Sequence, residues 1–186
     1  MGKEAFTAKT NHIFLIYLFM SMVMFLMVTS SCKKDDENKS NDVERFFNYD
    51  GKTYTLTNGI LGSYGATGED SYELELWLYS GITIINADSV SGKGCWIGIN
   101  LNSNAPTLTP GNYLKVDDGY APFTSRGAAF VISWDSALEN QQYIYVKSGL
   151  VKVISVSGDQ IEISFDLVST ENKNVSGHYK GEVSVY

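Results

Sequence analysis

The sequence predicts an all-β fold, a single antiparallel β-sandwich over residues 44–186. About nine or ten short β-rich segments follow one another at regular spacing, and no long segment has a helical period. Apolar residues alternate with polar ones in several of these segments. This favours antiparallel pairing, because parallel strands are buried on both faces and read as continuous apolar runs. A lipocalin-like β-barrel fits the same pattern and remains the alternative.

The first half of the domain opens with a hairpin signal. Residues 45–49 and 52–56 flank Asp50-Gly51, a pair typical of two-residue turns in which both positions have positive φ. Alternating apolar residues then predict strands at 72–79, 82–86, 95–101, 111–116 and 128–134, with Ala128, Phe130, Ile132 and Trp134 on one face.

The second half continues in the same way. Residues 136–142 are compatible with one or two helical turns. Gly181 lies within the last predicted strand, where glycine marks a bulge or a close approach. Further strands are predicted at 143–146, 149–156, 160–167 and 176–186, with Ile161, Ile163, Phe165, Leu167, Tyr179, Val183 and Val185 facing inward.

The N-terminal segment has the organisation of an export signal. Lys3 and Lys9 precede an apolar run at residues 13–28, and small residues follow before Cys32. The run is shorter than the roughly 20 apolar residues of a spanning helix. We therefore predict a signal peptide at residues 1–31, cleaved before Cys32, rather than a transmembrane anchor.

Thr29-Ser30-Ser31-Cys32 resembles the lipobox of bacterial lipoproteins. Thr29 departs from that pattern, which has a large aliphatic residue three positions before the cysteine. The resemblance implies that Cys32 is acylated, with palmitate-type chains, and becomes the new N-terminus. Several acyl chains anchor a protein stably where one chain does not.

Residues 32–43 are polar and charged, as expected of a flexible tether. Lys34, Asp35, Asp36 and Glu37 resemble the export signal of Bacteroidota surface lipoproteins. The resemblance implies an outer-membrane protein, lipid-anchored and exposed at the cell surface. Gly177 to Gly181 and the closing strands are also similar to small Bacteroidota lipoprotein domains of unknown function, which implies a β-sandwich and no known activity.

Composition argues against several classes of function. The chain has 14 Lys and Arg against 21 Asp and Glu, a net charge of -7, so we expect no nucleic-acid partner. With Cys32 lipidated, Cys95 has no intramolecular disulfide partner and reads as a buried thiol. His178 reads as a surface residue and Asp117-Asp118-Gly119 as a turn. We expect no enzyme activity, no cofactor and no metal site.

One strand face is the candidate binding site. Glu73, Glu75, Trp77 and Tyr79 alternate with the core residues of segment 72–79, and Trp96 is expected on the same outer side. Aromatic rings can stack on sugars, and carboxylates accept hydrogen bonds from hydroxyl groups. The sequence therefore suggests a binding module for a glycan or another envelope protein. An ordinary solvated face would look alike, and a structural accessory of an outer-membrane complex without a small ligand is the alternative function. The oligomeric state stays open.

Two short motifs concern modification. Asp88-Ser89-Val90 and Asp135-Ser136-Ala137 resemble the acceptor triplet of Bacteroidota O-glycosylation. The resemblance implies that Ser89 and Ser136 carry glycans. Both triplets lie between predicted strands, where a glycan would fit.

Overall fold

The computed structural model describes residues 45–86 and 89–186 of the chain. This part is all-β, with no helix, and its strands form one curled mixed sheet. The arrangement is that of a β-sandwich or a barrel-like fold, as predicted. The strands are β1 (Phe46–Tyr49), β2 (Lys52–Thr55), β3 (Asn58–Gly68), β4 (Ser71–Asn86), β5 (Ser89–Ser103), β6 (Gly111–Lys115), β7 (Thr124–Asp135), β8 (Ile144–Ser157), β9 (Gln160–Ser169), β10 (Asn174–Glu182) and β11 (Ser184–Val185).

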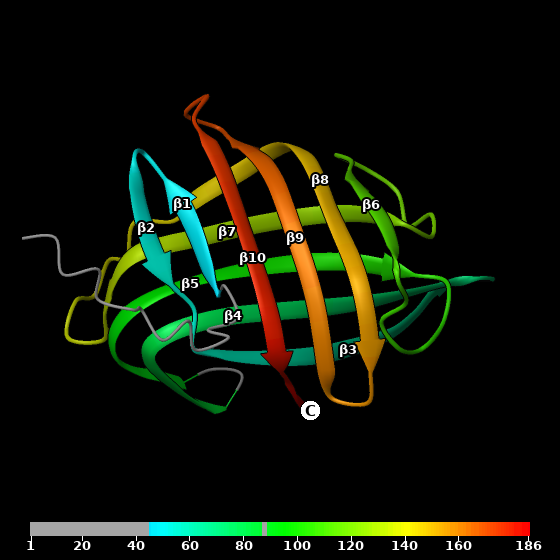
Figure 1. The fold of residues 1–186 in the computed structure, drawn as a ribbon, viewed down its shortest axis with the longest axis horizontal. Helices are drawn as coiled ribbons and strands as arrows, with labels where there is room; N and C mark the ends of the chain where they lie inside the picture. Colours follow the sequence, from blue (N-terminus) through cyan, green and yellow to red (C-terminus); the bar gives the residue numbers. More distant parts are fainter. Residues whose placement is uncertain (1–44, 87–88) are drawn as a thin grey trace, which may run out of the picture. The chain divides into compact units, whose positions relative to one another are not determined.

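The order of the strands makes two layers out of one sheet. Neighbours follow the order β11-β3-β4-β5-β7-β6-β8-β9-β10-β1-β2, with an additional β7–β8 pairing. Figure 1 shows β3, β4, β5 and β7 running side by side, while β8, β9 and β10 cross them at a steep angle. The apolar face of each layer packs against the other, because the sheet curls over on itself.

The core lies between these layers. Leu74, Leu76 and Leu78 of β4 are buried there, as the alternation predicts. The predicted inward residues of β9 and Tyr179 of β10 are buried as well. Phe47 and Tyr49 of β1 pack their rings edge-on against Phe130 of β7. The N-terminal strand therefore contributes to the centre of the domain and not only to its rim.

Two glycine predictions are confirmed. Asp50 and Gly51 both have positive φ, 52° and 73°, as a two-residue turn between twisted strands requires. At Gly181 a Cβ atom would lie 2.8 Å from the Arg45 guanidinium. The Arg45 Nε donates a hydrogen bond to the Lys180 carbonyl at 2.8 Å, so this glycine admits the arginine that joins the start of the domain to β10.

A sharp bend in β4 and β5 contributes to the curl. A Cβ atom at Gly94 would lie 1.9 Å from the Ser80 carbonyl oxygen, and one at Gly81 would lie 2.4 Å from the Lys93 carbonyl oxygen. The two backbones thus approach more closely than any side chain allows. Gly81 also has a φ of 73°, and the register between the strands shifts at this point.

Several boundaries differ from the prediction. β3 was not predicted, because its sequence NGILGSYGATG is rich in glycine and does not alternate. β4 and β8 are single long strands where the sequence predicted two each. In both, a register shift, at Gly81 in β4 and between Val146 and Ser148 in β8, lets the pairing with the neighbouring strand continue. No helix forms at 136–142. The sheet is mixed because two short pairs, β6–β7 and β11–β3, are parallel.

Two inward predictions were wrong. Trp134 does not join Phe130 in the main core, because a register shift between β5 and β7 interrupts the alternation. Its ring packs with a second, smaller cluster on the outer side of the sheet. Val185 is exposed because it belongs to β11, a separate short strand at the edge of the sheet, and does not continue β10.

Candidate functional site

The predicted outer face exists and belongs to β3, β4, β5 and β7. Glu73, Glu75, Trp77 and Tyr79 alternate with the buried leucines of β4, so their side chains project away from the core. In the register of the sheet, Glu75 lies opposite Gly62 of β3 and Asn100 of β5. The residues facing β4 therefore decide what this face can bind.

The aromatic end of the face is closed. The rings of Trp77 and Trp96 stack with their centroids 4.6 Å apart, and Tyr143 meets Trp96 edge-on at 5.8 Å. Trp96 is only 5% exposed and forms a small apolar cluster with Ile82 and Val131. Trp96 thus lies on the predicted side of the sheet, but its ring is committed to packing and offers no open platform for a ligand.

The opposite end of the face is polar. Asn100 Nδ2 donates a hydrogen bond to Glu73 Oε1 at 3.2 Å, and Arg126 Nη1 lies 3.8 Å from the same oxygen. The Arg126 guanidinium also lies 4.2 Å from the centre of the Tyr120 ring, a distance at which cations are attracted to aromatic faces. Four side chains from three strands and a loop converge on one point.

Glu75 forms the next polar contact along β4. The Tyr64 hydroxyl donates a hydrogen bond to Glu75 Oε2 at 2.6 Å. This bond and partial burial raise the pKa of Tyr64 to about 12. The Tyr186 ring lies over Gly62, where a Cβ atom would come within 2.7 Å of its Cζ. Burial and the charge of Glu75 raise the pKa of Tyr186.

We call the polar part of this face the outer strip. It consists of six residues: Tyr64, Glu73, Glu75, Asn100, Tyr120 and Arg126. Sequence reasoning found its two glutamates and missed the other four. Asn100 was within reach, because it lies out of phase with the buried Ile97, Ile99 and Leu101. Tyr64 lies on the unpredicted β3, and Tyr120 and Arg126 carried no pattern.

Cys95 does not form a reactive site. Its side chain is buried in the main core and its Sγ lies 3.6 Å from the Thr55 carbonyl oxygen. Burial raises the pKa of the Cys95 thiol, so the group stays protonated and a poor nucleophile at neutral pH. The structure therefore agrees with the reading of a small buried apolar residue.

His178 projects from β10 toward β9 on the outer surface. Its Nε2 lies 3.3 Å from Glu162 Oε1, and Lys180 Nζ lies 2.9 Å from the other oxygen of the same carboxylate. The hydrogen bond from Lys180, together with the one from His178, holds the pKa of Glu162 below its usual range. These partly exposed contacts are typical of pairs that join neighbouring strands.

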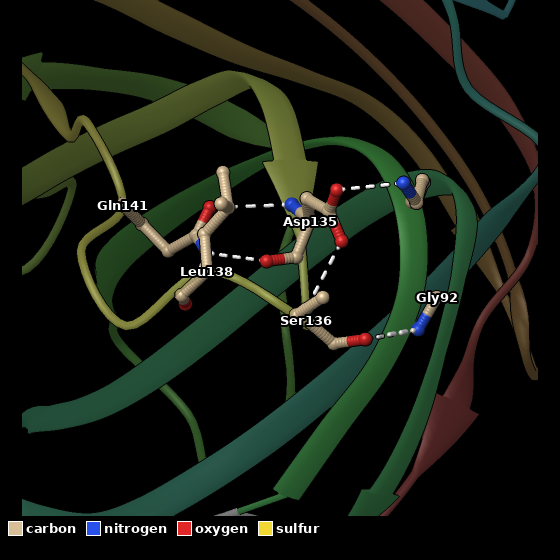
Figure 2. Close-up of polar contacts among 7 residues, drawn as sticks. Gly92, Asp135, Ser136, Leu138 and Gln141 are labelled. Carbon is tan, nitrogen blue, oxygen red and sulfur yellow. Dashed lines mark hydrogen bonds and ion pairs between the residues drawn. The ribbon is translucent and has the colours of Figure 1, made fainter.

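Ser136 lies in a tightly bonded turn after β7 (Figure 2). Its backbone N–H donates to the Gly92 carbonyl at 3.0 Å, and its Oγ accepts from the Gly92 N–H at 3.1 Å. Gln141 bonds both backbone groups of Asp135, as Figure 2 shows. Its Oε1 accepts from the Asp135 N–H at 3.2 Å, and its Nε2 donates to the Asp135 carbonyl at 2.6 Å. Ser136 is nevertheless exposed, while Ser89, at the start of β5, is half-buried.

No group of three or more His, Cys, Asp or Glu side chains in residues 45–86 and 89–186 could hold a metal ion. In the same ranges no helix is long and apolar enough to cross a membrane. Cys32 and the charged residues Lys34, Asp35, Asp36 and Glu37 lie outside the described residues.

No protein-family model, curated protein or solved structure matches this chain.

Proposed function

We propose that this chain is a lipid-anchored binding module at the bacterial cell surface, and that its ligand binds at the outer strip. The resemblance of Cys32 and its surroundings to a lipobox supports the anchor. The resemblance of Lys34 to Glu37 to a surface export signal supports the outward location. The ligand is a glycan or a surface segment of another envelope protein. The resemblance to Bacteroidota lipoproteins supports the membrane address and is silent about the ligand.

The convergence of Glu73, Asn100, Arg126 and Tyr120 carries this proposal. These side chains supply a carboxylate, an amide and a guanidinium beside an exposed ring, the mixture of donors and acceptors that recognises hydroxyl groups. Gly127 of β7 lies opposite Asn100, and the space above it is open. A ligand can therefore approach the amide and the arginine closely.

No reaction is part of the proposal. Glu73 and Glu75 are two residues apart on one strand, and each accepts a hydrogen bond from a neighbouring side chain. A glycosidase needs one carboxyl group to protonate a leaving oxygen and a second to act from the other side of the bond. Here both carboxylates are already engaged by neighbouring side chains, so the proposal is confined to binding.

A glycan array, followed by titration of any hit by calorimetry, tests the proposal. Asn100→Ala and Tyr120→Ala should each weaken binding about tenfold or more, since each removes a direct contact. Asp166→Asn is the matched control, because Asp166 is exposed on β9 and is no part of the outer strip. Unchanged affinity in both strip variants would place the ligand elsewhere.

A second candidate function is an assembly accessory of an envelope complex. Leu114 of β6 and Leu150 of β8 pair in register and are 57% and 37% exposed. Adjacent exposed leucines are a typical contact for another protein. Crosslinking in cells followed by purification would capture a fixed partner, and the double change Leu114→Ser with Leu150→Ser should abolish capture. Capture that survives this change would count against this function.

A further inference from the structure

We propose that Tyr64, Glu75 and Tyr186 form a site for an organic cation, an ammonium or guanidinium group carried by the ligand. This inference deepens the proposed function, on which it rests, by naming the chemistry recognised at one end of the same face. The three residues come from β3, β4 and the C-terminal segment after β11.

The geometry places a carboxylate beside two aromatic rings. Gly62 and Glu75 are paired across β3 and β4, and the Tyr186 ring covers Gly62 at the position where a side chain would start. The Tyr64 hydroxyl, also from β3, donates a hydrogen bond to Glu75 Oε2 at 2.6 Å. Tyr64 and Tyr186 are 63% and 65% exposed, so both remain accessible to a ligand.

The charge of Glu75 is not neutralised within the described residues. Its neighbour Glu73 lies beside Arg126, whereas no Lys, Arg or His in residues 45–86 and 89–186 forms an ion pair with Glu75. Among the residues that the structure describes, its one hydrogen-bond donor is the neutral hydroxyl of Tyr64, which bonds Oε2. Oε1 is left to accept a hydrogen bond from a cation.

Two exposed aromatic rings beside a carboxylate favour a positive group for a physical reason. The face of an aromatic ring attracts cations electrostatically. A carboxylate adds a charge-assisted hydrogen bond, which is stronger than a neutral one. Anions are repelled by the carboxylate, and a neutral sugar gains only the stacking contribution. The site therefore discriminates by charge.

The cation has two natural sources that share this chemistry, an amino sugar with a free amine and a lysine side chain. Isothermal titration of the full chain with three probes separates them. The probes are a trimer of glucosamine, a trimer of N-acetylglucosamine and trilysine. The two sugars share a scaffold and differ in the charge on nitrogen. Binding of at least one cationic probe, with the acetylated trimer about tenfold weaker or silent, is the expected result.

Two substitutions locate the site. Glu75→Gln keeps the shape of the side chain and removes its charge. It should weaken the binding of the cationic probe about tenfold. Gly62→Ala introduces a Cβ that displaces the exposed Tyr186 ring, and should weaken binding severalfold. Gly68→Ala is the control on the same strand, because a Cβ there meets no atom within 4 Å. Thermal unfolding confirms that each variant folds.

Tyr64→Phe separates the ring from the hydroxyl. This variant keeps the aromatic face and frees Glu75 Oε2, so cation binding should persist or strengthen, whereas Tyr64→Ala should weaken it. The inference is overturned if neither cationic probe binds, if the acetylated trimer binds as well as its deacetylated form, or if Glu75→Gln binds like the native domain. Loss of binding in Asn100→Ala alone would leave the proposed function standing without this site.

Discussion

Trp77 and Trp96 stack face to face on the outside of the sheet, with their ring centroids 4.6 Å apart. Trp77 comes from β4 and Trp96 from β5, and Gly98 leaves room for both rings, since a Cβ there would lie 3.2 Å from the Trp96 ring. The pair forms a small core on the side of the sheet facing away from the main core. Its role is therefore structural, and the proposed recognition is assigned to the polar residues beside it.

Trp96→Ala should lower the free energy of unfolding by about 3–5 kcal/mol, as expected for a buried tryptophan whose removal leaves a cavity. Trp77→Ala should cost less, because the Trp77 ring is partly exposed. Urea denaturation of both variants measures the difference. Equal and small losses would show that the outer cluster does not stabilise the domain.

Gly94→Ala should prevent correct folding. The new Cβ would lie 1.9 Å from the Ser80 carbonyl oxygen, and backbone atoms on both strands would have to separate. Gly127→Ala is the control, since a Cβ at Gly127 meets nothing within 4 Å. Circular dichroism and the yield of soluble protein check both variants. Normal folding of Gly94→Ala would contradict the close approach of β4 and β5.

The sequence predicted the fold class because burial imposes a period of two on β4 and β9, where alternating side chains face one core. β3 escaped prediction because glycines interrupt its alternation: Gly62 admits the Tyr186 ring, and Gly65 and Gly68 lie at register shifts. The face of Trp96 was predictable from its phase, but its burial was not. Burial depends on Tyr143 and Val131, which the sheet brings to Trp96 from other strands and loops.

The hydroxyl of Tyr64 should ionise with a pKa of about 12, above its usual value of 10.0. Because folding raises this pKa, the associated stability is complete below pH 10 and is lost as the pH rises through the folded value. Glu75→Gln should bring the pKa down toward 10.0, since the carboxylate is the main cause. Titration of the tyrosine ring signals by NMR measures this, and an unchanged pKa in the variant would contradict the hydrogen bond.

Cys32→Ser should release the protein from the membrane. If Cys32 carries the acyl chains that its lipobox resemblance implies, the change removes the anchor. Detergent phase separation and metabolic labelling with a palmitate analogue test this. Membrane retention without label in the native protein would show that the apolar run at residues 13–28 is itself the anchor.

Ser136 and Ser89 are expected to carry O-linked glycans, if their resemblance to the acceptor triplet holds. Ser136 is the better candidate, since it is exposed on a turn stabilised by Asp135 and Gln141. The intact mass of the native protein should exceed that of the polypeptide, and Ser136→Ala should remove one glycan. A native mass equal to that of the bare mature chain would rule out both sites.

The pairing of β1 with β10 has a consequence for the timing of folding. Arg45 and Lys180 are joined by a hydrogen bond across 135 residues of sequence, and Phe47 of β1 lies in the main core beside Phe130. The first strand to be synthesised has no neighbour on this side until nearly the whole chain exists. Such distant pairing slows folding. A newly made chain therefore cannot close its core until its last strands have been synthesised.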